Sequence, residues 1–376
     1  MITRLKASNF RSLGEVDLSL DPLTVLVGTN GAGKSNVADA LRFVSDAVRD
    51  GLDHAIASRQ GFGALRRWSG GPPHDVSLAL RVDLGDTGWE WSVVLTADRA
   101  NEYSVKEETA VATGIPGAPA SGCGYHVVQG GWERLPRRDI ELTPRPSSLV
   151  LPEIARLDAR FQPLSDHLAG LMVYALFPPA LRLPQASDPA RPMRRQGENW
   201  ATHLRGLDRA TQGAELLAAL GRVTGDIDDY RVQAVGGFLI PEFRHGEDGA
   251  RERWFGAAQE SDGTLRVAGL LTALLQSPSP SLIGIEEPEL AVHPGALPLL
   301  VDYMKQAAST TQVLITSHSP ELLDLVDPSC LRVVERGEGG TTVGPLAREQ
   351  LDAVRKKLTT TGEILRAEGL SGEPRG

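Results

Sequence analysis

The sequence predicts an α/β protein with a mostly parallel core sheet, an antiparallel β lobe and an inserted helical lobe. Three observations lead to this prediction. Residues 23–27 form an apolar run, and a glycine-rich turn and a stretch with helical spacing, 37–48, follow it. Short strand-like runs separated by Gly- and Asp-rich turns fill residues 77–135 and predict the antiparallel lobe. In the last third, strand-like and helix-like segments alternate, which is typical of a parallel sheet.

The middle of the chain differs from both ends. Residues 151–225 show mainly helical spacing, and a strand at 231–243 followed by another at 251–255 predicts a hairpin. The predicted elements then alternate as helix 265–275, strand 282–285, helix 295–307, strand 312–316, a short helix and strand 331–335. We therefore expect three segments, namely 1–150 with the glycine-rich turn and the β lobe, 151–277 as the helical lobe, and 278–376 as the return to the core sheet.

The composition is that of a soluble globular protein. Of 376 residues, 41% are hydrophobic and 23% are charged, and the net charge is −9, so any contact with nucleic acid would need a local basic patch. The cysteines, Cys123 and Cys330, indicate neither a disulfide framework nor a zinc site. The N-terminus is charged, and the most apolar stretch, 168–181, is short and broken by proline, so we expect a cytoplasmic protein without a membrane anchor.

The stretch GTNGAGKSN, residues 28–36, lies between the first predicted strand and helix. It satisfies the pattern G-x-x-x-x-G-K-[ST] with Gly28, Gly33, Lys34 and Ser35. Glycines let consecutive N–H groups turn toward phosphate oxygens, and the helix start adds positive charge. Lys34 is then expected to reach the β- and γ-phosphates and Ser35 to bind Mg²⁺. The alternative is a glycine-rich turn with an unrelated lysine, but the strand-to-helix context favours phosphate binding.

The stretch SLIGIEEPE, residues 281–289, is an apolar strand that ends in Glu286, Glu287 and Glu289. A magnesium nucleotide needs a carboxylate beside the metal shell, and hydrolysis needs a base that activates water. Glu286 suits the first role and Glu287 the second. Taken alone, the stretch could equally be a solvated acidic turn; together with the glycine loop, a nucleotide site is the better interpretation.

The stretch ESDGTLRVAGLLTALL, residues 260–275, begins with Ser261, Asp262 and Gly263 and continues as an apolar helix. Ser261 could simply cap this helix. The functional alternative is a second phosphate-reading helix start, in which Ser261 and Gly263 address a nucleotide held by another subunit.

The stretch QVLITSHSP, residues 312–320, is a strand that ends at Thr316, Ser317 and His318. Ligands of open parallel sheets bind at this end of the strands, so His318 is a candidate phosphate neighbour. A lone histidine is more often structural, but the position after the strand favours function.

These motifs, in this order, resemble the RecF/SMC-like branch of ABC-type ATPases, in particular the compact AAA-labelled ATPases related to RecF and OLD-family heads. The matching stretches are SNFRSLGEVDLSL, GTNGAGKSNVADAL as Walker A, SDGTLR as the signature, EEPELAVHP as Walker B with its following turn, TSHSPELL as the histidine switch, and TTTGEILRAEGL. The resemblance implies a P-loop NTPase fold of the ABC-ATPase head type, in which two copies face each other around two ATP molecules.

The resemblance also implies a role for each motif residue. The catalytic residues are Lys34, Glu287, which would activate water, and His318, which would sense the γ-phosphate. The Mg²⁺ ligands and supports are Ser35 and Glu286. The nucleotide-binding residues are Arg11, Asn30, Gly31, Ala32, Gly33, Lys34, Ser35 and Asn36, with Ser261 and Gly263 acting from the second copy. Arg11 is equally well interpreted as a surface arginine.

Some features depart from the family pattern. Glu286 stands where many relatives have aspartate, and no glutamine can be assigned to the Q-loop. The sequence has no heptad run, so we expect no long coiled coil, and little chain follows the ATPase motifs, so we expect no fused nuclease domain.

The favoured hypothesis is an ATPase that dimerises around ATP and controls DNA processing, in repair or in defence against invading DNA, through a separate effector such as a nuclease. The second hypothesis is a nucleotide-gated scaffold with low turnover. An ATPase subunit of a membrane transporter is weaker, because SDGTLR departs from the transporter signature. Arg137, Arg138 and the stretch 191–195 are candidates for contact with DNA, although a solvated surface is the simpler interpretation.

Overall fold

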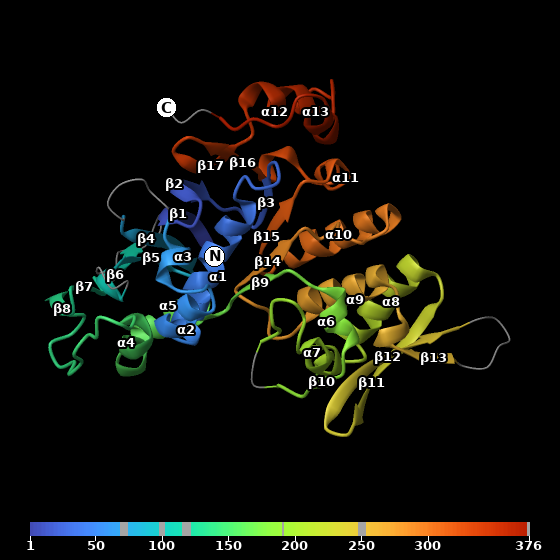
Figure 1. The fold of residues 1–376 in the computed structure, drawn as a ribbon, viewed down its shortest axis with the longest axis horizontal. Helices are drawn as coiled ribbons and strands as arrows, with labels where there is room; N and C mark the ends of the chain where they lie inside the picture. The colour runs from blue at the N-terminus through green and yellow to red at the C-terminus, as the bar shows by residue number, and fades with distance from the viewer. Residues whose placement is uncertain (68–73, 98–101, 115–121, 190–191, 247–252, 374–376) are drawn as a thin grey trace. The chain divides into compact units, whose positions relative to one another are not determined.

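The computed structural model describes residues 1–67, 74–97, 102–114, 122–189, 192–246 and 253–373 (Figure 1). The chain divides into two compact units, and each unit combines stretches that are far apart in sequence. Unit 1 contains Met1–Met172, Ser329–Asp352 and Leu370–Gly376, and unit 2 contains Val173–Pro328 and Ala353–Gly369. The division expected from the motifs, 1–150, 151–277 and 278–376, stays a prediction.

Unit 1 is built on a mixed sheet. Its strands are β1 (Ile2–Phe10), β2 (Leu13–Ser19), β3 (Leu23–Val27), β4 (Val76–Leu84), β5 (Thr87–Ala97), β6 (Tyr103–Gly114), β7 (Gly124–Val128), β8 (Gly131–Arg134), β16 (Leu331–Gly337) and β17 (Gly340–Pro345). They lie in the order β8-β7-β6-β5-β4-β1-β2-β17-β16-β3. Pairing is antiparallel from β8 to β2 and between β17 and β16, and it is parallel between β2 and β17 and between β3 and β16.

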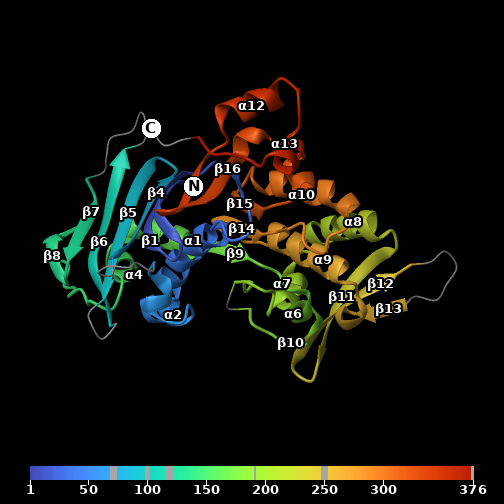
Figure 2. The same ribbon diagram turned by 45° about the horizontal axis from the view of Figure 1, so that its top comes forward.

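The antiparallel lobe follows from alternating side chains. Along β4, every second residue from Val76 to Val82 is buried, and the residues between them are partly exposed. Apolar residues at every second position bury one face of a strand and leave the other face to solvent. Figure 2 shows the resulting strands β4 to β7 side by side.

The helices of unit 1 begin directly after the glycine loop. They are α1 (Lys34–Arg49), α2 (Leu52–Ala57), α3 (Phe62–Leu65), α4 (Leu151–Leu157), the 3₁₀ helix η1 (Ala159–Phe161) and α5 (Gln162–Ala169). Helix α1 buries Val37, Leu41 and Val44, which recur at helical spacing. Phe43 of α1 contacts Phe10 edge to face, with ring centres 5.7 Å apart. These contacts fix the helix that starts at the loop.

Unit 2 combines a parallel strand pair, a small sheet and most of the remaining helices. Its strands are β10 (Gln185–Ala186), β11 (Ile227–Val235), β12 (Phe238–His245), β13 (Arg253–Gly256), β14 (Leu282–Glu286) and β15 (Gln312–Ser317). Its helices are α6 (Pro178–Arg182), α7 (Trp200–Gly206), α8 (Gln212–Thr224), η2 (Ala257–Gln259), α9 (Asp262–Leu275), η3 (Pro294–Ala296), α10 (Leu297–Ala307), α11 (Pro320–Leu323) and α13 (Thr361–Ala367). Residues of both units occur in β9 (Leu171–Tyr174), η4 (Pro328–Cys330) and α12 (Arg348–Arg355).

The parallel pair β14 and β15 positions the acidic motif and the histidine motif of unit 2. The two strands run in register, with Glu286 opposite Thr316. Glu287 and His318 therefore both follow the carboxyl ends of neighbouring parallel strands. Helix α9 is buried at every position from Leu265 to Leu274, as its continuous apolar sequence predicts.

The predicted α/β class is confirmed, with parallel pairing in core strands and an antiparallel lobe in unit 1. The predicted single strand at 231–243 is wrong. Gly236 and Gly237 have φ values of 58° and 86°, and they turn the chain between β11 and β12. Two successive glycines adopt such conformations at low cost, so this pair is the local signal for a hairpin here. Residues 247–249 of the predicted turn lie outside the described residues.

Candidate functional site

The glycine loop of unit 1 joins β3 to α1 in a conformation that its glycines permit. Gly31 and Gly33 have φ values of 78° and 115°, in the region that favours glycine. A Cβ on Gly28 would lie 2.2 Å from the carbonyl oxygen of Val334, so a larger residue does not fit there. The loop therefore requires the glycines that the sequence pattern contains.

Lys34 folds back over this loop. Its Nζ atom donates hydrogen bonds to the carbonyl oxygens of Gly28, at 2.7 Å, and Thr29, at 3.2 Å, and the residue is only 5% exposed. Helix α1 starts here without a side-chain cap and without an acidic residue in its first turn. Its first N–H groups have no acceptor within the helix, so the loop presents backbone donors and an ammonium together. This donor set fits a phosphate group.

The other predicted loop residues differ in how exposed they are. Asn30, Gly31 and Ser35 are exposed, whereas Ala32 is buried. The side chain of Asn36 donates a hydrogen bond to the Ser12 hydroxyl at 2.7 Å, so it contacts the turn between β1 and β2. The open face of the loop consists of the exposed residues and the start of α1.

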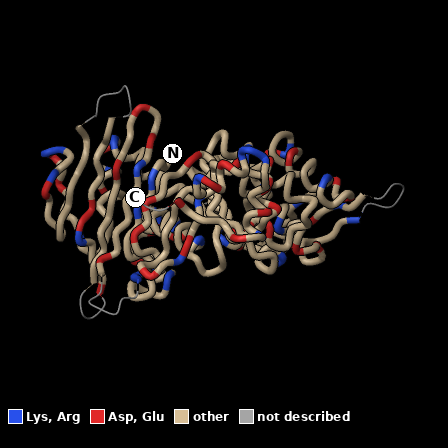
Figure 3. Tube along the Cα trace, turned by 90° about the horizontal axis from the view of Figure 1, so that it is seen from above, with Lys and Arg blue, Asp and Glu red and all other residues tan. Residues whose placement is uncertain are grey.

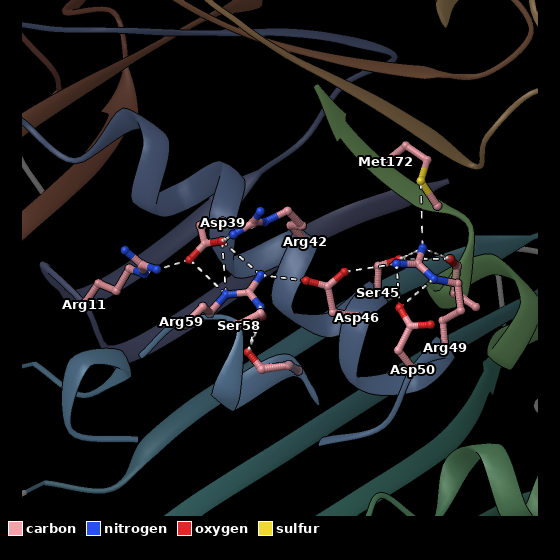
Figure 4. Close-up of polar contacts among 12 residues, drawn as sticks. Arg11, Asp39, Arg42, Ser45, Asp46, Arg49, Asp50, Ser58, Arg59 and Met172 are labelled. Atoms are coloured by element: carbon pink, nitrogen blue, oxygen red, sulfur yellow. Dashed lines mark hydrogen bonds and ion pairs between the residues drawn. The ribbon is translucent and has the colours of Figure 1, made fainter. Parts of the chain in front are cut away.

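Arg11 belongs to a cluster of charges along α1 (Figure 4). Its Nε atom lies 2.7 Å from the Oδ2 atom of Asp39, and Arg42 and Arg59 contact the same carboxylate. Burial raises the pKa of Asp39, but Arg59, Arg42 and Arg11 outweigh this effect and hold the pKa below its usual value. Arg59 also forms an ion pair with Asp46, which lies about two helical turns after Asp39 on α1. In this structure Arg11 therefore fastens a turn to α1, and its contact with nucleotide stays a prediction.

In unit 2, the acidic motif begins with a paired carboxylate. The Nη2 atom of Arg195 donates a hydrogen bond of 2.6 Å to the Oε1 atom of Glu286. The Glu286 side chain is 12% exposed. The neighbouring Glu287 has a φ of 46°, which non-glycine residues adopt at a cost in free energy. Its backbone N–H donates to the carbonyl oxygen of Thr316 at 2.9 Å, which holds this conformation against β15.

Arg266 of α9 ties the acidic motif to the signature helix. Its guanidinium donates to the carbonyl oxygens of Leu176 at 2.6 Å, Glu287 at 2.7 Å and Glu286 at 3.3 Å. Arg266 is 6% exposed, and burial lowers its pKa, although the nearby Glu289 and Glu287 oppose this effect. Arg266 was not among the predicted site residues. It follows the SDGTL stretch directly in the sequence, but its partners are not sequence neighbours.

His318 lies beside two of the acidic residues. Its Nδ1 atom is 3.3 Å from the Oε1 atom of Glu287 and 3.8 Å from the Oε1 atom of Glu289. Glu289 accepts hydrogen bonds from the Ser317 hydroxyl at 2.6 Å and from the His318 backbone N–H at 3.2 Å. The structure therefore brings Glu286, Glu287 and His318 together, as the motifs predict. Glu289, which had no predicted role, fastens the histidine turn to the acidic turn.

The predicted signature residues lie at the start of α9. Ser261 caps the helix, because its hydroxyl accepts a hydrogen bond of 3.0 Å from the Thr264 N–H. A Cβ on Gly263 would lie 2.8 Å from the Ala291 carbonyl oxygen, so this position requires glycine. Ser261 is exposed, and Asp262 pairs with Arg182 at 2.6 Å. The capping role of Ser261 is present, and its role toward a second copy stays a prediction.

The two motif residues expected to bind Mg²⁺ each carry oxygen donors, and a site formed by both stays a prediction. The described part of the chain has no group of three or more His, Cys, Asp or Glu that could hold a metal ion. Mg²⁺ needs no such group, since it binds through one or two protein oxygens, phosphates and retained water. Ser35 offers an exposed hydroxyl and Glu286 a carboxylate, which are oxygen donors of the required kind.

The basic stretches considered for DNA are largely paired with acids. Arg194 contacts Asp188 at 3.2 Å and Arg137 contacts Asp139 at 2.5 Å, while Arg195 is bound to Glu286. Arg191 lies outside the described residues. Along the described trace, Lys and Arg positions are interspersed with Asp and Glu positions (Figure 3).

None of the helices that the structure describes is long and apolar enough to cross a bilayer.

The chain is similar to several known proteins. Residues 147–324 match the family described as "AAA domain, putative AbiEii toxin, Type IV TA system", and residues 1–62 match "AAA ATPase domain". A segment of 44 residues is 50% identical to an OLD nuclease of Thermus scotoductus, but this match covers only 12% of the chain and 8% of that nuclease.

Solved structures of SMC heads share the fold. An SMC head bound to the C-terminal winged-helix domain of ScpA has a TM-score of 0.55 at 14% identity, over 93% of this chain and 98% of that one. An SMC head from Pyrococcus furiosus, with an extended coiled coil and bound to the C-terminal domain of ScpA, has a TM-score of 0.50 at 13% identity, over 95% and 99%. The fold is thus that of an ABC-type P-loop ATPase head. Together with this fold, the two AAA matches and the OLD nuclease segment support a compact ATPase of the RecF/SMC/OLD-like kind.

Proposed function

We propose that this chain binds Mg-ATP, hydrolyses it and pairs with a second copy around the nucleotide. The observation that carries the proposal is the glycine loop, which opens on the uncapped start of α1 and has Lys34 folded onto the Gly28 carbonyl. A triphosphate at this loop would meet backbone N–H groups, a helix N-terminus and an ammonium. This combination suits a triphosphate better than any uncharged ligand.

Each motif then has one chemical task. Lys34 would balance charge on the β- and γ-phosphates, and Ser35 and Glu286 would hold Mg²⁺, which neutralises charge on the phosphate oxygens when bound. Glu287 would accept a proton from the attacking water. Its position is supported by the bond from its N–H to Thr316, and His318, 3.3 Å from its carboxylate, would report the γ-phosphate.

Pairing of two copies would complete the site. In this proposal, Ser261 and Gly263 of one copy address the γ-phosphate of the ATP that the other copy binds. The exposed start of α9 supports this role, because Ser261 and Asp262 are exposed and Gly263 is partly exposed. Arg11 and Asn30 would contact nucleotide within their own copy.

The paired state would control DNA processing through a separate effector. Two similarities support this part of the proposal. The SMC heads of the same fold were solved with ScpA domains bound, and the Thermus scotoductus protein that shares a 44-residue segment is an OLD nuclease. We therefore propose a nuclease or a similar enzyme as the effector, in repair or in defence against invading DNA.

A low-turnover scaffold is the second candidate. The observation that favours it is the ion pair between Arg195 and Glu286, because a carboxylate held by arginine is less available to the metal shell. Such a chain would bind ATP and pair, yet release phosphate slowly while it held a partner enzyme.

Two variants test the proposal. Lys34→Ala is expected to abolish ATP binding, and Glu287→Gln is expected to bind ATP normally while phosphate release falls by about two orders of magnitude or more. Size-exclusion chromatography with and without ATP should show a stable Glu287→Gln dimer. Normal phosphate release by Glu287→Gln would remove the assigned base. A wild-type protein that pairs with ATP but barely releases phosphate would favour the scaffold.

A further inference from the structure

Two segments that are distant in sequence form hydrogen bonds with the glycine loop and the first turn of α1. Ser12 lies between β1 and β2, and Thr341 lies at the start of β17. The Thr341 Oγ1 atom donates to the carbonyl oxygen of Ala32 at 2.7 Å and lies 2.8 Å from the Ser12 Oγ atom. The Asn36 side-chain amide donates to the same Ser12 oxygen at 2.7 Å. Two hydroxyls thus connect the loop to the first turn of α1.

The hydrogen bonds of this chain of groups have a fixed direction. A hydroxyl donates only one hydrogen. Thr341 uses its hydrogen on the Ala32 carbonyl, so Ser12 must donate to Thr341. Ser12 in turn accepts from the amide of Asn36. The order is therefore Asn36 to Ser12 to Thr341 to Ala32, and every donor in it has an acceptor.

This arrangement determines which way one peptide group of the loop points. In a trans peptide the C=O and the next N–H point in opposite directions. Because the Ala32 carbonyl points to Thr341 beneath the loop, the N–H of Gly33 points away from Thr341. The carbonyl is held on the inner side, where its negative end is kept away from a bound phosphate, and an N–H donor is directed the other way.

The two hydroxyls also occupy the space that glycine leaves. A Cβ on Gly33 would lie 2.3 Å from the Thr341 Oγ1 atom and 2.9 Å from the Ser12 Oγ atom. Thr341 is fully buried, and its backbone N–H donates to the Ser12 carbonyl at 2.9 Å. The Thr341 hydroxyl is therefore held in place by strand pairing and cannot follow the loop if the loop moves.

We propose that Ser12 and Thr341 are positioning residues for phosphate binding, which act by holding the Ala32–Gly33 peptide in its anion-binding orientation. This inference rests on the proposed function, because it specifies how the ATP loop is preorganised. By holding this peptide, the two hydroxyls raise the affinity for the β- and γ-phosphates without contacting them. It predicts an effect on nucleotide affinity and on KM, with kcat unchanged at saturating ATP.

The test compares Thr341→Val, which keeps the shape and removes the hydroxyl, with Thr341→Ser, which restores the hydroxyl. The affinity for AMPPNP with Mg²⁺ is measured by calorimetry. We expect Thr341→Val to bind about tenfold more weakly, as the loss of a hydrogen bond at a preorganised site implies, and Thr341→Ser to bind within about twofold of wild type. Ser12→Ala, at a partly exposed position, provides a second variant and should weaken binding in the same direction.

A merely structural role would lower the Tm without nucleotide and leave the affinity unchanged. Wild-type affinity for AMPPNP in both Thr341→Val and Ser12→Ala would therefore overturn the inference. The proposed function has a different point of failure, because it fails if the wild-type protein binds no AMPPNP or if Lys34→Ala binds it equally well.

Discussion

The Nη2 atom of Arg195 lies 2.6 Å from the Oε1 atom of Glu286, at the carboxyl end of β14. The backbone carbonyl of Glu286 also accepts a hydrogen bond from Arg266, so two different arginines contact this residue. The side chain proposed to support Mg²⁺ thus has a positive partner within its own unit. In the proposed function, Arg195 would compete with the metal and its bound water for this carboxylate.

Arg195→Ala should therefore strengthen the response to Mg²⁺. Removal of the guanidinium frees the carboxylate and leaves the acidic turn more negative, and both effects attract a divalent cation. We expect the Mg²⁺ concentration for half-maximal phosphate release to fall by about threefold or more. Arg194→Ala is the matched control, because Arg194 pairs with Asp188 instead. An unchanged Mg²⁺ requirement in Arg195→Ala would show that the ion pair does not compete with metal.

Ser261 allows capping of α9 to be separated from pairing of two copies. Asp and Asn cap helices about as well as Ser, so Ser261→Asp and Ser261→Asn should both keep the wild-type Tm. The added carboxylate of Ser261→Asp would repel a γ-phosphate, so this variant should not form the ATP-dependent dimer, whereas the neutral Ser261→Asn should. Light scattering with ATP measures the outcome. A dimer of Ser261→Asp would mean that no phosphate lies near this residue in the pair.

Arg59 should be critical for the stability of unit 1. Its fully buried guanidinium contacts Asp39 at 2.9 Å and Asp46 at 3.0 Å, and it donates to the Ala55 carbonyl at 2.8 Å. Arg59→Leu leaves two poorly solvated carboxylates without this cation, which costs about 3–5 kcal/mol of unfolding free energy. The more exposed Arg42 shares the Asp39 carboxylate, and Arg42→Ala should cost about 1 kcal/mol or less. Urea unfolding of both variants tests the difference, and equal losses would contradict it.

Glu108 should make unit 1 sensitive to pH. The buried carboxyl group accepts hydrogen bonds from the Tyr125 hydroxyl at 2.6 Å and from the N–H groups of Val150 at 2.5 Å and Leu151 at 3.0 Å. Burial raises its pKa, although these donors oppose the change. Because the native pKa is above the unfolded value, the contribution to stability is fully present below the unfolded pKa. It is lost as the pH rises through the native pKa.

The matched variant for this prediction is Glu108→Gln, which does not titrate. It should be less stable than wild type by about 1–3 kcal/mol at acid pH, since its amide nitrogen cannot accept from the Val150 N–H. The advantage of wild type should shrink as the pH rises. Urea unfolding of both proteins across the pH range measures this difference. A constant difference at all pH values would place the native pKa of Glu108 at its ordinary value.

Local patterns in the sequence were enough to predict the elements that position the site. The apolar run 23–27 is β3, the predicted strands 282–285 and 312–316 lie within β14 and β15, and the predicted helix 265–275 lies within α9. Each of these depends on periodicity and on glycine or proline at its ends, which are properties of neighbouring residues. The hairpin of β11 and β12 was missed because its turn, Gly236–Gly237, lay inside an otherwise strand-like run.

The parts of the site that depend on distant residues were not predictable in this way. Arg195 stood out only as one member of a basic stretch, and its partner Glu286 is 91 positions away. Thr341 has no motif around it, and it contacts the loop only because β17 pairs with β2. Such contacts follow from strand order. The periodicity of neighbouring residues does not determine which strands lie side by side in a mixed sheet.

The hydrogen bond from Thr341 to the Ala32 carbonyl closes a separation of 309 positions along the chain. During synthesis, Ala32 leaves the ribosome long before the codon of Thr341 is read. The nascent loop therefore lacks this hydrogen bond until Thr341 has been made, so in the proposed function tight nucleotide binding would arise only after that point. A growing chain would thus be protected from engaging ATP, and from pairing with a finished copy, while its acidic and histidine motifs were still missing.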